Sequence, residues 1–387
     1  QTDFLMNEYD YIVVGAGTAG CVLANRLSAD PGKRVLLLEA GGKDDYFWIN
    51  IPVGYLFTIG NARTDWCFET TPEAGLNGRS LGYARGRVLG GCSSINAMIY
   101  MRGQKHDYDE WAALGNRGWS WDDVLPVFKR SEDYQHGASE FHGNEGELRV
   151  EERRVSWEIL DAWREAASET GIPKIEEYNR GDNFGTAYFQ MNQRRGRRCS
   201  AAHAFLNPAK SRNNLTVVTN AMVQGLELSS ETGELRATGV RVRVDGGEEQ
   251  VFKARGEVIL SAGSIGSPQL LQLSGIGPGS LLEKHGIAVQ RDLPGVGENL
   301  QDHLQIRTVY KVSNTTTLNA LYNSLWGKMK MGLQYLLFRT GPLTMPPSQL
   351  GAFAKSDPDQ PRPNIEWHVQ PLSLDKFGDP LHSFNAI

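Results

Sequence analysis

The sequence predicts an α/β fold, and three features carry that prediction. Tyr9 to Val14 is a β-branched and aromatic run, followed by the letters GAGTAG and then by apolar residues at helical spacing. A second apolar run, Arg34 to Leu38, completes a β-α-β unit of the kind that builds parallel sheets. A third run, Glu257 to Leu260, leads directly into the glycine-rich SAGSIGSPQLLQLSGIG. The strand-to-turn-to-helix pattern therefore occurs twice, as expected of a doubly wound parallel sheet.

The other predicted elements make the chain α+β overall. Apolar periodicity predicts two short helices within 106–133, an amphipathic helix at 157–170, and a helical, partly apolar stretch at 318–340. Further strands are predicted at 215–218, 239–244 and 364–369. The segment 41–100 is rich in glycine and aromatic residues and is predicted to be mostly irregular. Long irregular segments in compact domains are typically functional.

Composition excludes several classes of protein. The 40 Lys and Arg residues against 45 Asp and Glu residues give a net charge of −5, spread without long blocks of one sign. No nucleic-acid partner or polybasic membrane segment is therefore indicated. The basic run 194–198 is typical of a solvated loop, although near a cofactor it could meet phosphate. No segment approaches the ~18 apolar residues that span a bilayer, so no transmembrane segment is expected.

The four cysteines, Cys21, Cys67, Cys92 and Cys199, form no CxxC pair. Four thiols are also too few for a disulfide framework in a chain of 387 residues. We therefore expect reduced thiols and a cytoplasmic protein, with peripheral association with a membrane left open.

Gly15, Gly17 and Gly20 form a GxGxxG pattern between the first predicted strand and helix. Gly15 permits a tight turn, Gly17 lets backbone amides approach a pyrophosphate, and Gly20 allows close helix packing. Glu39 ends the second strand nineteen residues later, near the ~20 expected of an acid that binds ribose hydroxyls. The pattern predicts a Rossmann-like nucleotide-binding domain. The alternative is a plain tight turn with Glu39 exposed at a strand end. The turn alone does not separate FAD from NAD.

Two longer segments bear on that choice. Residues 85–98, RGRVLGGCSSINAM, form a glycine- and serine-rich loop that could lay backbone amides along a large planar cofactor. This loop resembles the first signature of the glucose-methanol-choline (GMC) flavoprotein oxidoreductases, and 263–277 resembles the second. The resemblance covers nearly the whole chain and looks strongest for the bacterial choline-dehydrogenase-like alcohol dehydrogenases and oxidases.

The resemblance implies an FAD-dependent enzyme that oxidises an alcohol to the aldehyde by hydride transfer to the flavin. It implies a discontinuous FAD-binding domain, 6–155 with 200–305, and a substrate-binding domain on an antiparallel sheet, 156–199 with 306–387. Its implied partners are a small-molecule alcohol and O2 or another electron acceptor. The oligomeric state is left open.

Carried over position by position, the resemblance implies a set of FAD contacts. Most lie in the glycine turn, after the second strand and in the 85–98 loop, and the set is Gly15, Gly17, Thr18, Ala19, Gly20, Glu39, Ala40, Arg87, Val88, Gly91, Ser93, Asn96, Ala97, Met98, Val223, Ala262 and Gly263. Ile95 stands where the choline-oxidising branch of the family carries a flavin-linking His. Because isoleucine cannot form that bond, non-covalent FAD is expected.

The catalytic residues are not identified by the sequence. The family's general base is a His in a His-Pro context, paired with a second His or an Asn, and no histidine of this chain stands there. The pair is expected beyond Ile387. His368 and His303 are better explained as structural residues. The His and Cys residues also lack the spacing of metal ligands, so no metal site is predicted.

Three alternatives stay open. Some members of this fold are hydroxynitrile lyases, and others are light-driven fatty-acid decarboxylases. The chain could also be an FAD-binding fragment that does not turn over.

Overall fold

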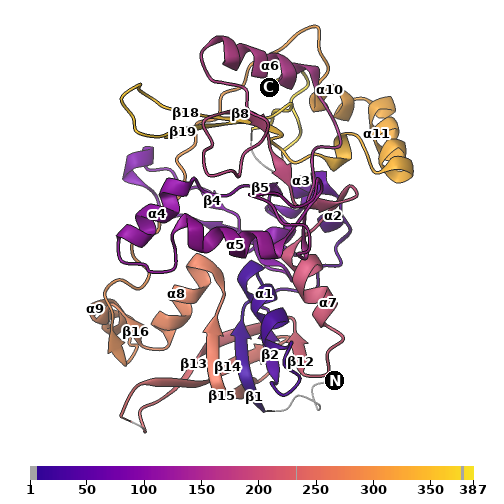
Figure 1. Cartoon of the computed structure of the whole chain (residues 1–387). Coiled ribbons are helices and arrows are strands. Elements are labelled where there is room, and N and C mark those ends of the chain that lie inside the picture. The colour runs from indigo at the N-terminus through magenta and orange to yellow at the C-terminus, as the bar shows by residue number, and fades with distance from the viewer. Residues whose placement is uncertain (1–6, 232, 376–378) are drawn as a thin grey trace. The chain divides into compact units, whose positions relative to one another are not determined.

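The computed structural model describes residues 7–231, 233–375 and 379–387. The chain forms two compact units, each built from three separate segments (Figure 1). The first unit contains the described residues up to Asp45, Gly60–Ile95 and Ser200–Ile306, and the second contains Tyr46–Ile59, Asn96–Cys199 and Arg307–Ile387. Met6, the first residue of the predicted nucleotide-binding domain, lies outside the described residues.

A six-stranded mixed sheet forms the centre of the first unit (Figure 1). Its strands, in spatial order, are β12 (Leu215–Val218), β2 (Val35–Leu38), β1 (Glu8–Val14), β15 (Glu249–Leu260), β14 (Arg236–Val244) and β13 (Ala221–Ser229). The first four are parallel, and β14 and β13 add antiparallel strands at one side. This arrangement confirms the predicted α/β, Rossmann-like fold.

The four parallel strands end level with one another. Val14 of β1 is paired with Leu38 of β2 and with Leu260 of β15, and Leu38 is also paired with Val218 of β12. Two helices begin a few residues beyond this edge, α1 (Thr18–Leu27) after β1 and α8 (Gly263–Leu273) after β15. The register therefore brings the two predicted strand-to-helix turns to one edge of the sheet.

Beneath this edge lies an apolar core. Ile12 and Leu36 are fully buried, and Phe252 and Leu270 bring β15 and α8 to the same cluster. The remaining elements of the first unit are short: β3 (Phe68–Glu69), η2 (Ala74–Leu76), β4 (Gly82–Tyr83), η3 (Gly91–Ser94), the π-helical turn η4 (Ala202–Leu206), α7 (Asn207–Ala209), β16 (Ile276–Gly277), α9 (Gly279–Lys284) and β17 (Arg291–Asp292).

The second unit contains a three-stranded antiparallel sheet in the order β19 (Ile365–Val369), β18 (Leu350–Ala354) and β8 (Gly185–Tyr188). Its longer helices are α4 (Lys105–Ala113), α5 (Trp121–Ser131), α6 (Glu158–Glu169), α10 (Leu318–Tyr322) and α11 (Leu325–Phe338). The shorter elements are α2 (Phe47–Asn50), η1 (Pro52–Gly54), α3 (Tyr55–Thr58), β5 (Ile99–Tyr100), β6 (Glu132–Tyr134), β7 (Leu148–Val150), β9 (Gln190–Met191), β10 (Gln193–Arg194), β11 (Arg197–Arg198) and η5 (Pro342–Thr344).

Local signals explain where several elements begin and end. The two helices predicted within 106–133 are α4 and α5, and Ser120 and Asp123 form a reciprocal capping box that starts α5. The predicted helix at 318–340 is two helices, because Ser324 caps a new start by accepting a hydrogen bond from the Gly327 N–H. The segment 41–100 holds only elements of two to four residues, as its composition indicated.

The predicted division into an FAD-binding domain, 6–155 with 200–305, and a substrate-binding domain, 156–199 with 306–387, concerns function and stays a prediction. The compact units follow a different division, since 46–59 and 96–155 pack with the second unit. Within the described residues, none of the helices combines the length and apolar character that crossing a bilayer requires.

Replacing Ile12 by alanine should destabilise the first unit by about 2–5 kcal/mol, because a fully buried side chain in the central strand leaves a cavity. Val251→Ala is the matched control, since Val251 is 40% exposed on β15, and it should stay within about 0.5 kcal/mol of the parent. Urea unfolding measures both free energies. Equal effects of the two variants would show that the sheet is not packed as described.

Candidate functional site: a glycine-lined edge of the sheet

The turn after β1 depends on close backbone contacts. Gly15 has a φ of 97°, and a Cβ there would lie 2.6 Å from the Ser261 carbonyl oxygen. A Cβ on Gly20 would overlap the carbonyl oxygen of Gly15. The Ser261 hydroxyl donates to that same oxygen at 2.8 Å, which links the turn to the end of β15. Gly15 and Gly20 are therefore required by the geometry of this turn.

Glu39 lies directly beneath the turn and is only 5% exposed. Its Oε2 accepts the N–H of Ala16 at 2.8 Å, and its Oε1 accepts the N–H of Gly41 at the same distance. Burial raises the pKa of this carboxyl, while the two backbone N–H groups oppose that shift. The alternative of an exposed acid at a strand end is therefore wrong, and Glu39 connects the first two strand-end loops.

The loop from Arg85 to Ser94 runs against the glycine turn. The Gly90 N–H donates to the Ala16 carbonyl oxygen at 2.8 Å, and a Cβ on Gly91 would lie 2.8 Å from the Gly17 Cα. Ser93 Oγ donates to the Gly90 carbonyl oxygen at 2.6 Å and accepts the Ala201 N–H at 2.9 Å. The two glycine-rich segments that are far apart in the sequence thus form one surface.

This surface suits an anionic, polar group. Neither α1 nor α8 has an acidic residue in its first turn, and the first N–H groups of a helix have no partner within the helix. Beyond Gly17 the Cβ position meets only the Ser261 carbonyl oxygen at 4.0 Å, and beyond Gly263 nothing lies within 4 Å. The edge therefore offers both free volume beside Gly17 and Gly263 and the N–H donors at the starts of α1 and α8.

Arg87 adds a charged donor to the same edge. Its guanidinium carbon lies 4.9 Å from the centre of the Trp66 ring, which holds the side chain by a cation–π contact. Its Nε is buried and has no hydrogen-bond partner within the described part of the chain. Because buried donors in folded proteins are almost always paired, this atom indicates an acceptor other than the described protein groups.

The structure brings most of the predicted contact residues together in the first unit. They follow the ends of β1, β2 and β15 or lie in the loop that packs on them: Gly15, Gly17, Thr18, Ala19, Gly20, Glu39, Ala40, Arg87, Val88, Gly91, Ser93, Ala262 and Gly263. Val223 differs, because its side chain is buried in the core of the sheet. Only its backbone could face a ligand, near the start of β13, where the Ala221 N–H donates to the Glu39 carbonyl oxygen.

Asn96, Ala97 and Met98 belong to the second unit. The Asn96 Oδ1 accepts the Met98 N–H and one Nη of Arg198, each at 3.0 Å, and Met98 has a positive φ of 60°. Arg198 is 3% exposed, whereas Arg194, Arg195 and Arg197 are exposed. The basic run is thus a hairpin with one arginine turned inward, and not entirely a solvated loop.

The two histidines considered in the sequence analysis, His303 and His368, show no contacts with other described residues that are typical of a catalytic pair. His368 is on β19, where its Nε2 lies 2.6 Å from Glu366 Oε1 and its side chain is 39% exposed. His303 is exposed, and its N–H donates to Asp302. Over the described ranges, no group of three or more His, Cys, Asp or Glu residues could hold a metal ion.

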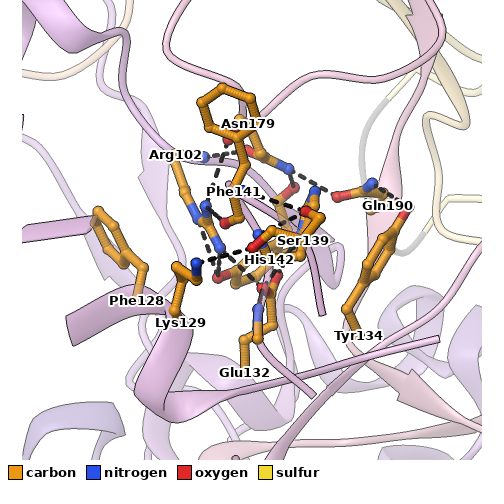
Figure 2. A network of polar contacts seen from close by, with 12 residues as sticks. Arg102, Phe128, Lys129, Glu132, Tyr134, Ser139, Phe141, His142, Asn179 and Gln190 are labelled. Carbon is orange, nitrogen blue, oxygen red and sulfur yellow. Dashed lines mark hydrogen bonds and ion pairs between the residues drawn. The ribbon is translucent and has the colours of Figure 1, made fainter. Parts of the chain in front are cut away.

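A buried polar network in the second unit was not predicted from the sequence (Figure 2). Arg102 Nη2 lies 3.0 Å from Glu132 Oε2, and His142 Nδ1 lies 3.1 Å from both Glu132 oxygens. All three side chains are at most 1% exposed. The His142 ring stacks on Tyr134, with 3.9 Å between ring centres. These residues are far apart in the sequence with no common motif, so no sequence signal marks the network.

Within the network, His142 carries the titratable proton. Burial lowers the pKa of its imidazole, but the hydrogen bond to Glu132 and the negative charges of Glu132 and Glu177 outweigh that effect and raise the pKa above 6.5. Its Nε2 lies 3.4 Å from Glu177 Oε2, close enough for attraction although outside hydrogen-bond geometry. Every group in the network faces another protein group, so the network is best explained as structural.

Comparisons with known proteins agree on one family. A model of the GMC oxidoreductases matches residues 9–305. The "oxygen-dependent choline dehydrogenase" of Photobacterium profundum is 42% identical over 95% of this chain and 64% of its own length. The "alcohol dehydrogenase [acceptor]" of Pseudomonas putida is 40% identical over 96% of this chain and 67% of its own.

Solved structures show the same fold. Pyridoxine 4-oxidase from Mesorbium loti has a TM-score of 0.78 and 34% identity, covering 90% of this chain and 63% of its own. An FAD-dependent oxidoreductase from Chaetomium thermophilum has a TM-score of 0.81 and 30% identity, covering 89% and 61%. The chain spans about two thirds of the length of the curated relatives it matches.

The buried network makes stability depend on pH. Because the pKa of His142 is raised in the folded state, its contribution is complete below pH 6.5 and is lost as pH rises through the raised value. His142→Gln should therefore cost about 1–3 kcal/mol at low pH and less above the raised pKa. His136→Gln, at a 58% exposed imidazole, is the control. Urea unfolding across this range tests it, and an unchanged pH slope in His142→Gln would refute it.

Proposed function

The chain belongs to the GMC oxidoreductase family, and from that premise we propose that it binds FAD and oxidises an alcohol to the aldehyde. The observation that carries the cofactor proposal is the edge of the parallel sheet. There, glycine positions that tolerate no side chain adjoin open positions, two helix starts and the unpaired Arg87 Nε. FAD has a pyrophosphate and ribose hydroxyls, which match donors of this kind.

We assign the binding residues as follows. The N–H groups of Gly17, Thr18 and Ala19 at the start of α1 would donate hydrogen bonds to phosphate oxygens, and Arg87 Nε would donate to a further acceptor. Glu39 keeps lone pairs beyond the two that its backbone donors use, and these would accept ribose hydroxyls. When bound, FAD supplies the ring that accepts hydride from a CH–OH donor.

The remaining predicted contacts stay proposals for FAD binding. They lie in the strand-end loops, in the 85–98 segment and, for one residue, near the start of β13: Gly15, Gly20, Ala40, Val88, Gly91, Ser93, Asn96, Ala97, Met98, Val223, Ala262 and Gly263. Asn96 to Met98 belong to the second unit, and their assignment rests on the resemblance alone. The base that accepts the alcohol proton has no assigned residue.

The substrate class follows from the family alone. The relatives include proteins named for choline and for alcohols, so a small-molecule alcohol is the proposed substrate, with O2 or another acceptor taking the electrons. A screen of primary alcohols, including choline, with oxygen and a dye acceptor run in parallel would assign both. Release of cyanide from a cyanohydrin, or of hydrocarbon from a fatty acid under blue light, would instead indicate other chemistry.

The purified protein should carry flavin that acid precipitation releases into the supernatant, because Ile95, a buried aliphatic residue, offers no atom for a covalent link. Absorbance of the supernatant and chromatography of the released flavin measure this outcome. Yellow colour left in the precipitate would contradict non-covalent binding. A colourless protein that takes up no added FAD would overturn the cofactor proposal.

Arg87→Met should weaken FAD binding by about tenfold or more, because a charge-assisted hydrogen bond is lost, typically about 1.5–3 kcal/mol. The apoprotein should stay within about 1 kcal/mol of the parent, because the lost cation–π contact with Trp66 opposes the removal of a buried donor that has no partner among the described residues. The control is Arg79→Met, at an exposed arginine of the same unit. Fluorescence titration of apoprotein with FAD and urea unfolding separate the two effects. Lower stability with unchanged affinity would assign Arg87 a structural role.

A further inference from the structure

Helix α11, labelled in Figure 1, has many exposed apolar side chains. Seven of its apolar side chains are between 49% and 79% exposed: Leu325, Trp326, Met329, Leu333, Leu336, Leu337 and Phe338. At about 100° per residue, the first six fall within a sector of about 120°. Gly327, Met331 and Tyr335 are the buried residues of the helix. The helix is thus apolar toward its own unit and also on its outer face.

The charged residues in this part of the sequence are all basic. From His303 to Ser356 the sequence contains no Asp or Glu, but six basic residues: Arg307, Lys311, Lys328, Lys330, Arg339 and Lys355. Lys328 and Lys330 lie on either side of the apolar sector of α11. Lys328 Nζ also lies 4.5 Å from the centre of the Tyr322 ring of α10. The net charge of −5 for the whole chain conceals this basic stretch.

We propose that α11 docks this protein on the surface of an anionic lipid bilayer. An apolar sector with an aromatic residue, flanked by lysines and free of acids, is the pattern of helices that lie in the plane of a membrane interface. The lysines would meet the lipid phosphates while the apolar sector enters the acyl boundary. At 14 residues the helix is shorter than the ~20 residues that span a bilayer, so it would lie on the membrane.

A second copy of the chain fits this face less well. Two copies related by a twofold axis would pack the same face against itself, which brings Lys328 and Lys330 of both copies together. A bilayer containing phosphatidylglycerol supplies the opposite charge and matches the apolar sector. The proposal concerns where the protein acts and is independent of cofactor binding, so it stands or falls separately from the FAD proposal.

The test is co-sedimentation of the purified polypeptide with vesicles. Vesicles of phosphatidylcholine with phosphatidylglycerol should bind the parent at least about tenfold more tightly than vesicles of phosphatidylcholine alone. The double variant Leu333→Glu/Leu337→Glu should lose about tenfold or more of the binding to anionic vesicles. Lys328→Gln/Lys330→Gln should lose about tenfold there and change little on neutral vesicles.

Leu114→Glu is the matched control, because Leu114 is 77% exposed at the end of α4 and the change adds one charge of the same kind. Circular dichroism establishes that each variant is folded. The proposal is wrong if the parent does not bind anionic vesicles, or if Leu333→Glu/Leu337→Glu binds as the parent does. A changed oligomeric mass with unchanged lipid binding would show that protein covers α11.

Discussion

The contact between Gly20 and the carbonyl oxygen of Gly15 is the constraint on which the proposed site depends. Because no Cβ fits between them, α1 can begin close to the end of β1 only with glycine at position 20. The Ser261 hydroxyl then binds the same oxygen and connects β15 to the turn. One backbone oxygen thus aligns the starts of α1 and α8, whose first N–H groups are the natural donors to phosphate.

Glu39 extends this arrangement to the neighbouring strand. A buried carboxylate is costly unless it is paired, and here two backbone N–H groups supply the pairing. The same contacts hold the loops after β1 and β2 in register, so the carboxylate has a structural role before any ligand binds. Arg87 is the opposite case, because its buried Nε has no acceptor among the residues that the structure describes. The site therefore contains a carboxylate whose hydrogen bonds are made by the protein and a buried guanidinium N–H donor without a partner among the described residues.

Much of the fold was predictable because its signals are local. The turn at Gly15 to Gly20 needs particular backbone conformations, and glycine at fixed spacing records that need directly in the sequence. The parallel strands β1 and β2 are short apolar runs, and they were found for the same reason. The predicted fold class and family are confirmed. The assignment of individual residues to FAD rests on the resemblance and stays a prediction.

Other features escaped because their signals are not local. Strand β15 has twelve residues, but only its last four were predicted, since the segment 249–256 is mostly polar or charged and contains no long apolar run, and its first residues are held by pairing with β14. The network of Arg102, Glu132 and His142 joins residues up to 40 positions apart, and none of them alone differs from a surface residue. Burial strengthens the interactions among these charged groups and changes the pKa of His142, and burial is known only once the chain is folded.

The net charge is another property of the whole sequence that does not reveal local features of the folded surface. A net charge summed over 387 residues predicts an even surface only if the charges are mixed on the scale over which they act. That scale is a Debye length of about 8–10 Å, far shorter than the dimensions of either unit. Lys328 and Lys330, on either side of the apolar sector of α11, interact mainly with charges within that distance. A chain that is acidic overall can therefore present a basic, apolar helix to an anionic surface, and local patterning decides which surface it meets.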